Sequence, residues 1–177
     1  MNQKGMISCF LCVMLCICFT VGTGGCKKSE EIQIDPTGSL LQYDGCKQFQ
    51  DNNNMTQALM ANRNDCLQYQ YDGQNTLILM HVNAGFNCCP GDITAEIEFN
   101  GNSIAITESE QEQGCHCLCL FDLDYKVTNL PPGRYTIRVI EPYVEENDQV
   151  LECTLEFFSA TSGSYCLERN DYPWIIQ

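Results

Sequence analysis

Residues 93–106 have the sequence ITAEIEFNGNSIAI, and this stretch decides the fold class. Apolar and polar side chains alternate over residues 93–99, which is the period of a strand with one buried face. Asn100-Gly101-Asn102 then predicts a tight hairpin turn, because Asn and Gly tolerate positive φ angles. Residues 103–108 return with Ile104 and Ile106 on the inner face. The stretch therefore predicts an antiparallel β-hairpin.

The same pattern continues on both sides of this hairpin. Further strands are predicted at residues 68–71, 76–86, 115–127, 134–143 and 150–158. About seven short strands with closely spaced turn signals are typical of an all-β, antiparallel, immunoglobulin-like sandwich. Good helix formers at Met55–Arg63 predict one short helix before the sandwich.

Residues 130–139 support this architecture through a resemblance. Their sequence LPPGRYTIRV resembles the L-x-P-G-x-Y-x-I-x-V hairpin of transthyretin-like and carboxypeptidase-regulatory-like domains. The resemblance implies a Greek-key sandwich in which Gly133 begins a strand and Tyr135 packs near its start. It implies architecture only, because such scaffolds carry many unrelated functions.

The first 26 residues indicate where the protein resides. Lys4 is followed by an apolar run over residues 6–21, small residues and Cys26, which is the order of an export signal rather than a membrane span. The segment resembles a bacterial lipoprotein signal, which implies that Cys26 is lipidated. An ordinary cleaved signal that leaves a plain thiol is the alternative. We expect a signal peptide at 1–25, a lipid anchor and tether at 26–45, and one cysteine-rich domain at 46–177.

The segment after the anchor bears on location within the envelope. Lys27-Lys28-Ser29-Glu30-Glu31 resembles the surface-export tag of some Gram-negative lipoproteins, although a solvated linker explains it equally well. We therefore expect a lipid-anchored protein of the bacterial cell envelope, at the outer membrane or cell surface rather than the inner membrane.

The charge of the chain excludes one class of partner. The formal net charge is −14, and all acidic residues follow Cys26. Nucleic acid is not an expected partner, because phosphate binding needs a basic surface. Attachment to a membrane would rest on acyl chains alone.

The chain has 14 cysteines, nine of which follow Cys26. An exported chain so rich in cysteine is expected to form disulfides. Because nine is odd, one cysteine is left over, and Cys153 on the apolar face of a strand is the predicted free thiol. The remaining eight are the disulfide candidates: Cys46, Cys66, Cys88, Cys89, Cys115, Cys117, Cys119 and Cys166.

A thiolate metal site is the alternative use of these cysteines. Its candidate ligands for zinc are His81, Cys88, Cys89, Cys115, Cys117 and Cys119. Residues two apart in a strand are separated by about 6.5–7 Å, so one straight strand offers only two of its three cysteines to one ion. We favour disulfides between Cys88 or Cys89 and the strand that carries Cys115–Cys119, and expect His81 to be a hydrogen-bonded core residue.

No stretch of the sequence matches a hydrolase, transferase or phosphate-binding motif. We therefore expect a binding or structural module without enzymatic activity or a cofactor, whose partner is an envelope protein or a glycan. The alternatives are a thiolate metal-binding protein and a thiol redox enzyme or hydrolase without a recognisable motif. At the C-terminus, Tyr172-Pro173-Trp174 is predicted to pack down as a lid.

Overall fold

The computed structural model describes residues 34–47, 63–112 and 114–174. The predicted signal peptide, Cys26 and nearly all of the predicted helix Met55–Arg63 lie outside these ranges. The described residues form nine strands: β1 Thr37–Tyr43, β2 Asn64–Tyr71, β3 Leu77–Asn87, β4 Ile93–Asn100, β5 Ser103–Glu110, β6 Leu118–Thr128, β7 Gly133–Ile140, β8 Leu151–Phe157 and β9 Thr161–Glu168.

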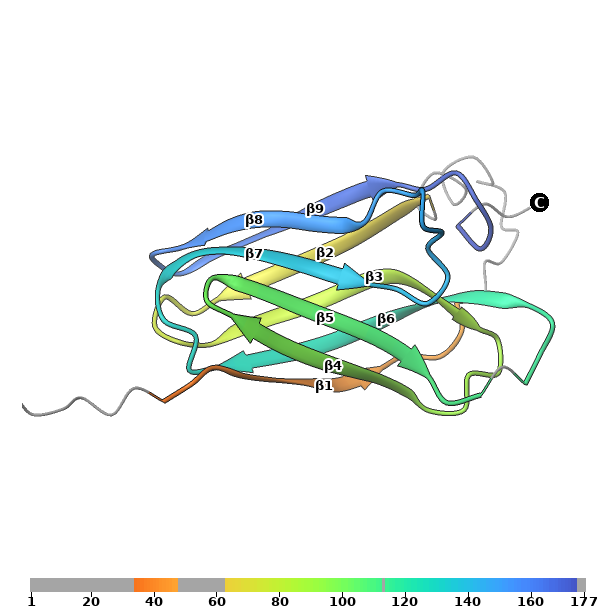
Figure 1. The fold of residues 1–177 in the computed structure, drawn as a ribbon, viewed down its shortest axis with the longest axis horizontal. Coiled ribbons are helices and arrows are strands. Elements are labelled where there is room, and N and C mark those ends of the chain that lie inside the picture. The colour runs from red at the N-terminus through yellow and green to blue at the C-terminus, as the bar shows by residue number, and fades with distance from the viewer. Residues whose placement is uncertain (1–33, 48–62, 113, 175–177) are drawn as a thin grey trace, which may run out of the picture. The chain divides into compact units, whose positions relative to one another are not determined.

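The strands form two sheets that pack face to face as a β-sandwich (Figure 1). One sheet has the order β1-β6-β3-β2-β9, and all of its pairs are antiparallel. The other has the order β4-β5-β7-β8, with a parallel pair between β5 and β7. The predicted all-β sandwich is confirmed, and no described residue is helical.

Two strands were not predicted, and both lie at edges of the five-stranded sheet. β1 occupies residues assigned to the tether and pairs only with β6, so the predicted tether is too long at its C-terminal end. β9 follows the strand predicted to be the last, and pairs only with β2. Edge strands bury less side-chain surface, so their apolar signal is weak. In β9, a Cβ on Gly163 would lie 2.5 Å from the Tyr69 hydroxyl, so that the tyrosine side chain would have to shift.

The strand that the LPPGRY motif predicted begins as expected. β7 starts at Gly133, and the hydroxyl of the buried Tyr135 donates to the carbonyl oxygen of Pro131 at 2.9 Å. Asn129, just before the motif, has a φ of 58°. The turn is thus closed by its own side chains, which fixes where β7 enters its sheet.

The connections between strands divide into two sets at opposite ends of the sandwich (Figure 1). We call one the turn end; its connections are residues 72–76, 101–102, 129–132 and 158–160. We call the other the disulfide end; it comprises residues 44–47, 88–92, 111–117 (apart from 113), 141–150 and 169–174. Within the described ranges, no helix has the length and apolar character needed to cross a bilayer.

Candidate functional site

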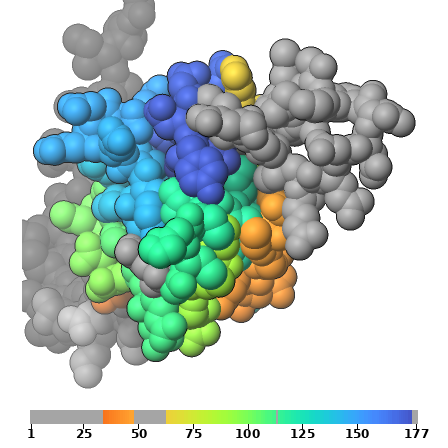
Figure 2. All heavy atoms as spheres, turned by 90° about the vertical axis from the view of Figure 1, so that its right-hand side faces the viewer, coloured from red at the N-terminus to blue at the C-terminus, as the bar shows by residue number. Residues whose placement is uncertain are grey.

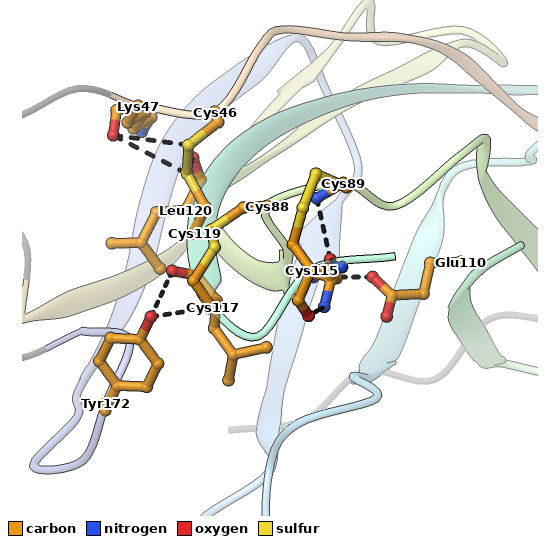
Figure 3. The surroundings of a disulfide bond; sticks show 12 residues. Cys46, Lys47, Cys88, Cys89, Glu110, Cys115, Cys117, Cys119, Leu120 and Tyr172 are labelled. Atoms are coloured by element: carbon orange, nitrogen blue, oxygen red, sulfur yellow. Dashed lines mark hydrogen bonds between the residues drawn. A yellow bond between two sulfur atoms is a disulfide. The ribbon is translucent and has the colours of Figure 1, made fainter. Parts of the chain in front are cut away.

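Eight of the nine cysteines after Cys26 form four disulfides, as the sequence predicted. All four lie at the disulfide end, and three of them appear together in Figure 3. The pairs are Cys46–Cys119, Cys66–Cys166, Cys88–Cys117 and Cys89–Cys115. The predicted pairing of Cys88 or Cys89 with the segment around Cys115–Cys119 is confirmed, and both cysteines are bonded there, whereas Cys119 itself bonds to Cys46.

The segment with Cys115 and Cys117 is a loop rather than the start of the predicted strand, because β6 begins only at Leu118. The side chain of Asn87 holds this loop. Its Oδ1 accepts the backbone N–H groups of Cys89 and Cys115 at 2.9 and 3.1 Å, and its Nδ2 donates to the Cys115 carbonyl at 2.7 Å. These bonds hold Cys89 and Cys115 next to one another, while the backbone N–H of Cys88 donates to the Cys117 carbonyl at 3.0 Å.

The remaining two disulfides connect strands. Cys46 follows β1 and is bonded to Cys119 in β6, with a Cα separation of 5.6 Å. Cys66 in β2 and Cys166 in β9 are directly opposite one another, with a Cα separation of 4.1 Å. Both edge strands of the five-stranded sheet are therefore linked covalently to their neighbours.

Cys153 is free and buried, as predicted. Burial, together with the charge of Glu152, raises the pKa of its thiol to about 11. A thiol of such high pKa is protonated at neutral pH and is a poor nucleophile.

His81 does not lie among cysteines. It is fully buried between the sheets, as predicted for a core histidine, but its partners are carboxylates. Its Nδ1 lies 2.6 Å from Oε1 of Glu108, and its Nε2 lies 2.7 Å from Oδ1 of Asp65. The hydroxyl of Tyr125 donates to the same oxygen of Glu108 at 2.5 Å. The sulfurs of the other candidate ligands are bonded in pairs, and so they are not thiolates in this structure.

Arg169 completes the cluster. Its guanidinium donates to Oδ2 of Asp65 and, at 2.8 Å, to Oε1 of Glu141. Oε2 of Glu141 lies 3.8 Å from Nε2 of His81. Side chains from β2, β3 and β5 and from the ends of β7 and β9 thus meet between the sheets. We call the set Asp65, His81, Glu108, Glu141 and Arg169 the charged cluster.

The members of the charged cluster change one another's pKa. Burial alone would lower the pKa of His81, but the charges of Glu108 and Glu141 and the hydrogen bonds raise it well above its usual value. Burial would raise the pKa of Asp65, yet His81 and Arg169 lower it overall. For Glu141, burial dominates and raises the pKa to about 8. At neutral pH, His81 is therefore protonated and Glu141 is neutral.

The C-terminal segment covers this end of the interior, as the predicted lid. Trp174 is 2% exposed, donates its Nε1–H to the carbonyl of Asn83 at 2.8 Å, and stacks on Arg169. The Tyr172 hydroxyl donates to the Leu118 carbonyl at 2.7 Å. Figure 2 shows this segment next to the start of β6 and the 141–150 connection.

A second candidate surface is a shallow hollow of about 510 Å³ on the outer face of the five-stranded sheet. Two cross-strand rows form it. One contains Ser164, Gln68 and Met80, and the other contains Ser162, Gln70 and Ile78. Neutral hydrogen-bonding groups thus lie beside an apolar strip.

The partners of His81 were not identified from the sequence. A signal existed for Glu108, because period two places it on the same face as Ile104 and Ile106. Asp65 likewise shares a face with Leu67. The same alternation places Glu141 on the face of Ile137 and Val139 in the predicted strand 134–143, whereas no strand was predicted around Arg169.

Comparison of this chain with known proteins found no relative. No family model, no curated protein and no solved structure matches this chain. The resemblance of residues 130–139 to transthyretin-like domains is therefore a statement about one hairpin, and the function has to be inferred from the site.

Proposed function

We propose that this chain is an exported, lipid-anchored β-sandwich that acts as a binding module at the bacterial cell envelope, with its binding surface at the disulfide end. Its partner is an envelope protein or a glycan. The outer membrane or cell surface is the proposed location, with lipid on Cys26 as the attachment.

The observation that carries the proposal is that all four disulfides secure the end of the sandwich with the long connections. Disulfides persist in oxidising compartments, which agrees with the export signal. Loops positioned by a rigid scaffold are where binding residues concentrate. Covalent links hold the connections that carry Cys46, Cys88, Cys89, Cys115 and Cys117 before a partner arrives, and so reduce the entropy lost on binding.

The buried state of the charged cluster favours a binding module over an enzyme. Asp65 and His81 are 0% exposed, and Trp174 and Arg169 lie over them. Among the described residues, these groups are closed off from solvent. We therefore assign no catalytic step to this histidine and its carboxylates.

Attachment is tested by membrane fractionation of the wild type beside Cys26→Ala in a bacterial host. We expect the wild type in the membrane fraction and the variant in the soluble fraction. Mass spectrometry of the N-terminal peptide should show acyl chains only in the wild type. A variant that remains in the membrane fraction would refute the lipid anchor.

Binding is tested with a photo-crosslinking residue placed in intact cells. Position 116, exposed in the disulfide end, is compared with Gln70 in the hollow and with Glu98 on β4. A discrete adduct from position 116 and none from position 98 supports the proposal. An adduct from position 70 alone would move the binding surface to the sheet face, and no adduct at either position would contradict a binding role.

A further inference from the structure

Three potential metal ligands converge inside the charged cluster. They are Nε2 of His81 and one carboxylate oxygen each of Asp65 and Glu141, and all lie within 4.8 Å of one another. All three residues are buried. They come from β2, from β3 and from the residue after β7, so they join the two sheets.

Each ligand is oriented by a second partner behind it. Nδ1 of His81 is held by Glu108, which leaves Nε2 directed at the other two residues. Arg169 binds Oδ2 of Asp65 and Oε1 of Glu141, which leaves the opposite oxygen of each facing Nε2. A carboxylate behind a histidine and hydrogen bonds behind ligating carboxylates are the outer-shell arrangement of metal sites in proteins.

Two buried carboxylate oxygens of the cluster lack a hydrogen-bond partner among the described residues, Oε2 of Glu108 and Oε2 of Glu141. Oε2 of Glu141 accepts no hydrogen bond from the described residues, although the side chain is 1% exposed. A buried acceptor without a partner costs about 1–3 kcal/mol. This oxygen faces the His81–Asp65 pair at 3.8 Å from Nε2 and is therefore available to a cation placed there.

The formal charges also suit a divalent ion. When an ion displaces the protons of His81 and Glu141 to the solvent, three carboxylates and one guanidinium leave two negative charges. A divalent cation balances them inside a low-dielectric interior, where unbalanced charge is costly.

We propose that Asp65, His81 and Glu141 bind one divalent first-row transition-metal ion, with zinc as the representative, as a structural link between the two sheets. Ligand bonds of about 2.0–2.2 Å suit zinc with imidazole and carboxylate ligands. The ion takes the place of the proton between Nε2 and Oδ1, now 2.7 Å apart, and satisfies Oε2 of Glu141. This site has nitrogen and oxygen ligands and shares only His81 with the thiolate set considered from the sequence.

The test uses the full secreted chain with its disulfides intact. The protein is unfolded in denaturant without reductant and refolded with cobalt(II) or zinc. We expect one ion per chain, d–d absorption of bound cobalt without a thiolate charge-transfer band, and a Tm that rises with metal concentration. Absence of stoichiometric binding, or a thiolate band, overturns the proposal.

Glu141→Gln is the decisive variant. It removes one ligand charge, while its amide oxygen still accepts from Arg169, so the metal-free fold is kept. We expect metal affinity to fall more than tenfold. Glu146→Gln, at an exposed glutamate of the same connection, and His116→Gln, at the exposed histidine, should bind like the wild type. Unchanged affinity in Glu141→Gln would place the ion on surface acids and overturn the proposal.

X-ray absorption at the zinc edge of the wild type gives an answer that does not depend on any variant folding. One imidazole and oxygen neighbours are expected. Sulfur neighbours, or scattering without imidazole, would contradict this site.

Discussion

The two ends of the sandwich interior are built from different chemistry, although the same strands run through both. At the turn end, Tyr71 and Tyr135 stack on Phe157 with ring centroids 5.1 and 6.1 Å apart. At the disulfide end, the inward positions hold the charged cluster beside the edge-to-face pair of Phe86 and Phe121. Strand alternation therefore specifies which side chains face inward, but not whether those side chains are apolar.

The two ends should also respond differently to mutation. An apolar contact is non-directional, so its neighbours can relax toward a small cavity. A buried charge needs particular partners, and removing one leaves the others uncompensated. The charged end should therefore be the more sensitive to a single substitution.

The largest effect is expected for Arg169→Met, measured in chelator so that the metal-free state is compared. The change removes the buried guanidinium that binds Asp65 and Glu141, and the free energy of unfolding should fall by about 4 kcal/mol. Arg134→Met removes an exposed ion pair with Glu156 and should cost less than about 1 kcal/mol. Equal losses in the free energy of unfolding for the two variants, measured by urea denaturation, would contradict the proposed sensitivity of the charged end.

Leu77→Ala at the turn end should have the next largest effect. Leu77 is 0% exposed, and truncation should lower the free energy of unfolding by about 3 kcal/mol through lost burial and a cavity. Leu41→Ala is the matched control because Leu41 is 55% exposed, and its loss should be within about 0.5 kcal/mol. If Leu77→Ala lowered the free energy of unfolding more than Arg169→Met, the turn end would be the more sensitive of the two ends.

Removing one tyrosine hydroxyl at each end of the sandwich compares the two ends with a minimal change. Tyr125→Phe removes a donor to the buried Glu108 carboxylate and should cost about 2 kcal/mol. Tyr71→Phe removes a donor to the carbonyls of Gln74 and Leu130 and should cost about 1 kcal/mol. Chemical denaturation of both variants under one condition measures the difference between their losses in free energy of unfolding. Equal losses would show that the Glu108 site is open to water.

The smallest effect is expected for Cys153. In a form that begins at Lys27, a thiol reagent at pH 8 should label no cysteine of the native protein, because the thiol is buried and its pKa is raised to about 11. In denaturant without reductant, one thiol per chain should react. Labelling of several thiols would show that the four disulfides are incomplete, and rapid native labelling would show that Cys153 is accessible.

Much of the fold could be predicted because a strand is a local pattern. Residues 93–106 contain their own alternation and turn, and they form the predicted antiparallel hairpin of β4 and β5. The edge strands β1 and β9 could not be found in this way. Their sequences, TGSLLQY and TSGSYCLE, mix apolar residues with small and polar ones without a clear alternation, and their backbones pair with β6 and β2.

The sequence by itself determined the all-β class, the need for disulfides and the inward direction of His81 and Cys153. These depend on alternation and composition, which are local. Only the tertiary structure decided which cysteines pair and which groups surround His81. Asp65 and Arg169, for example, meet although 104 residues separate them. Partners so far apart are brought together by strand order and sheet packing, and no local pattern contains that order.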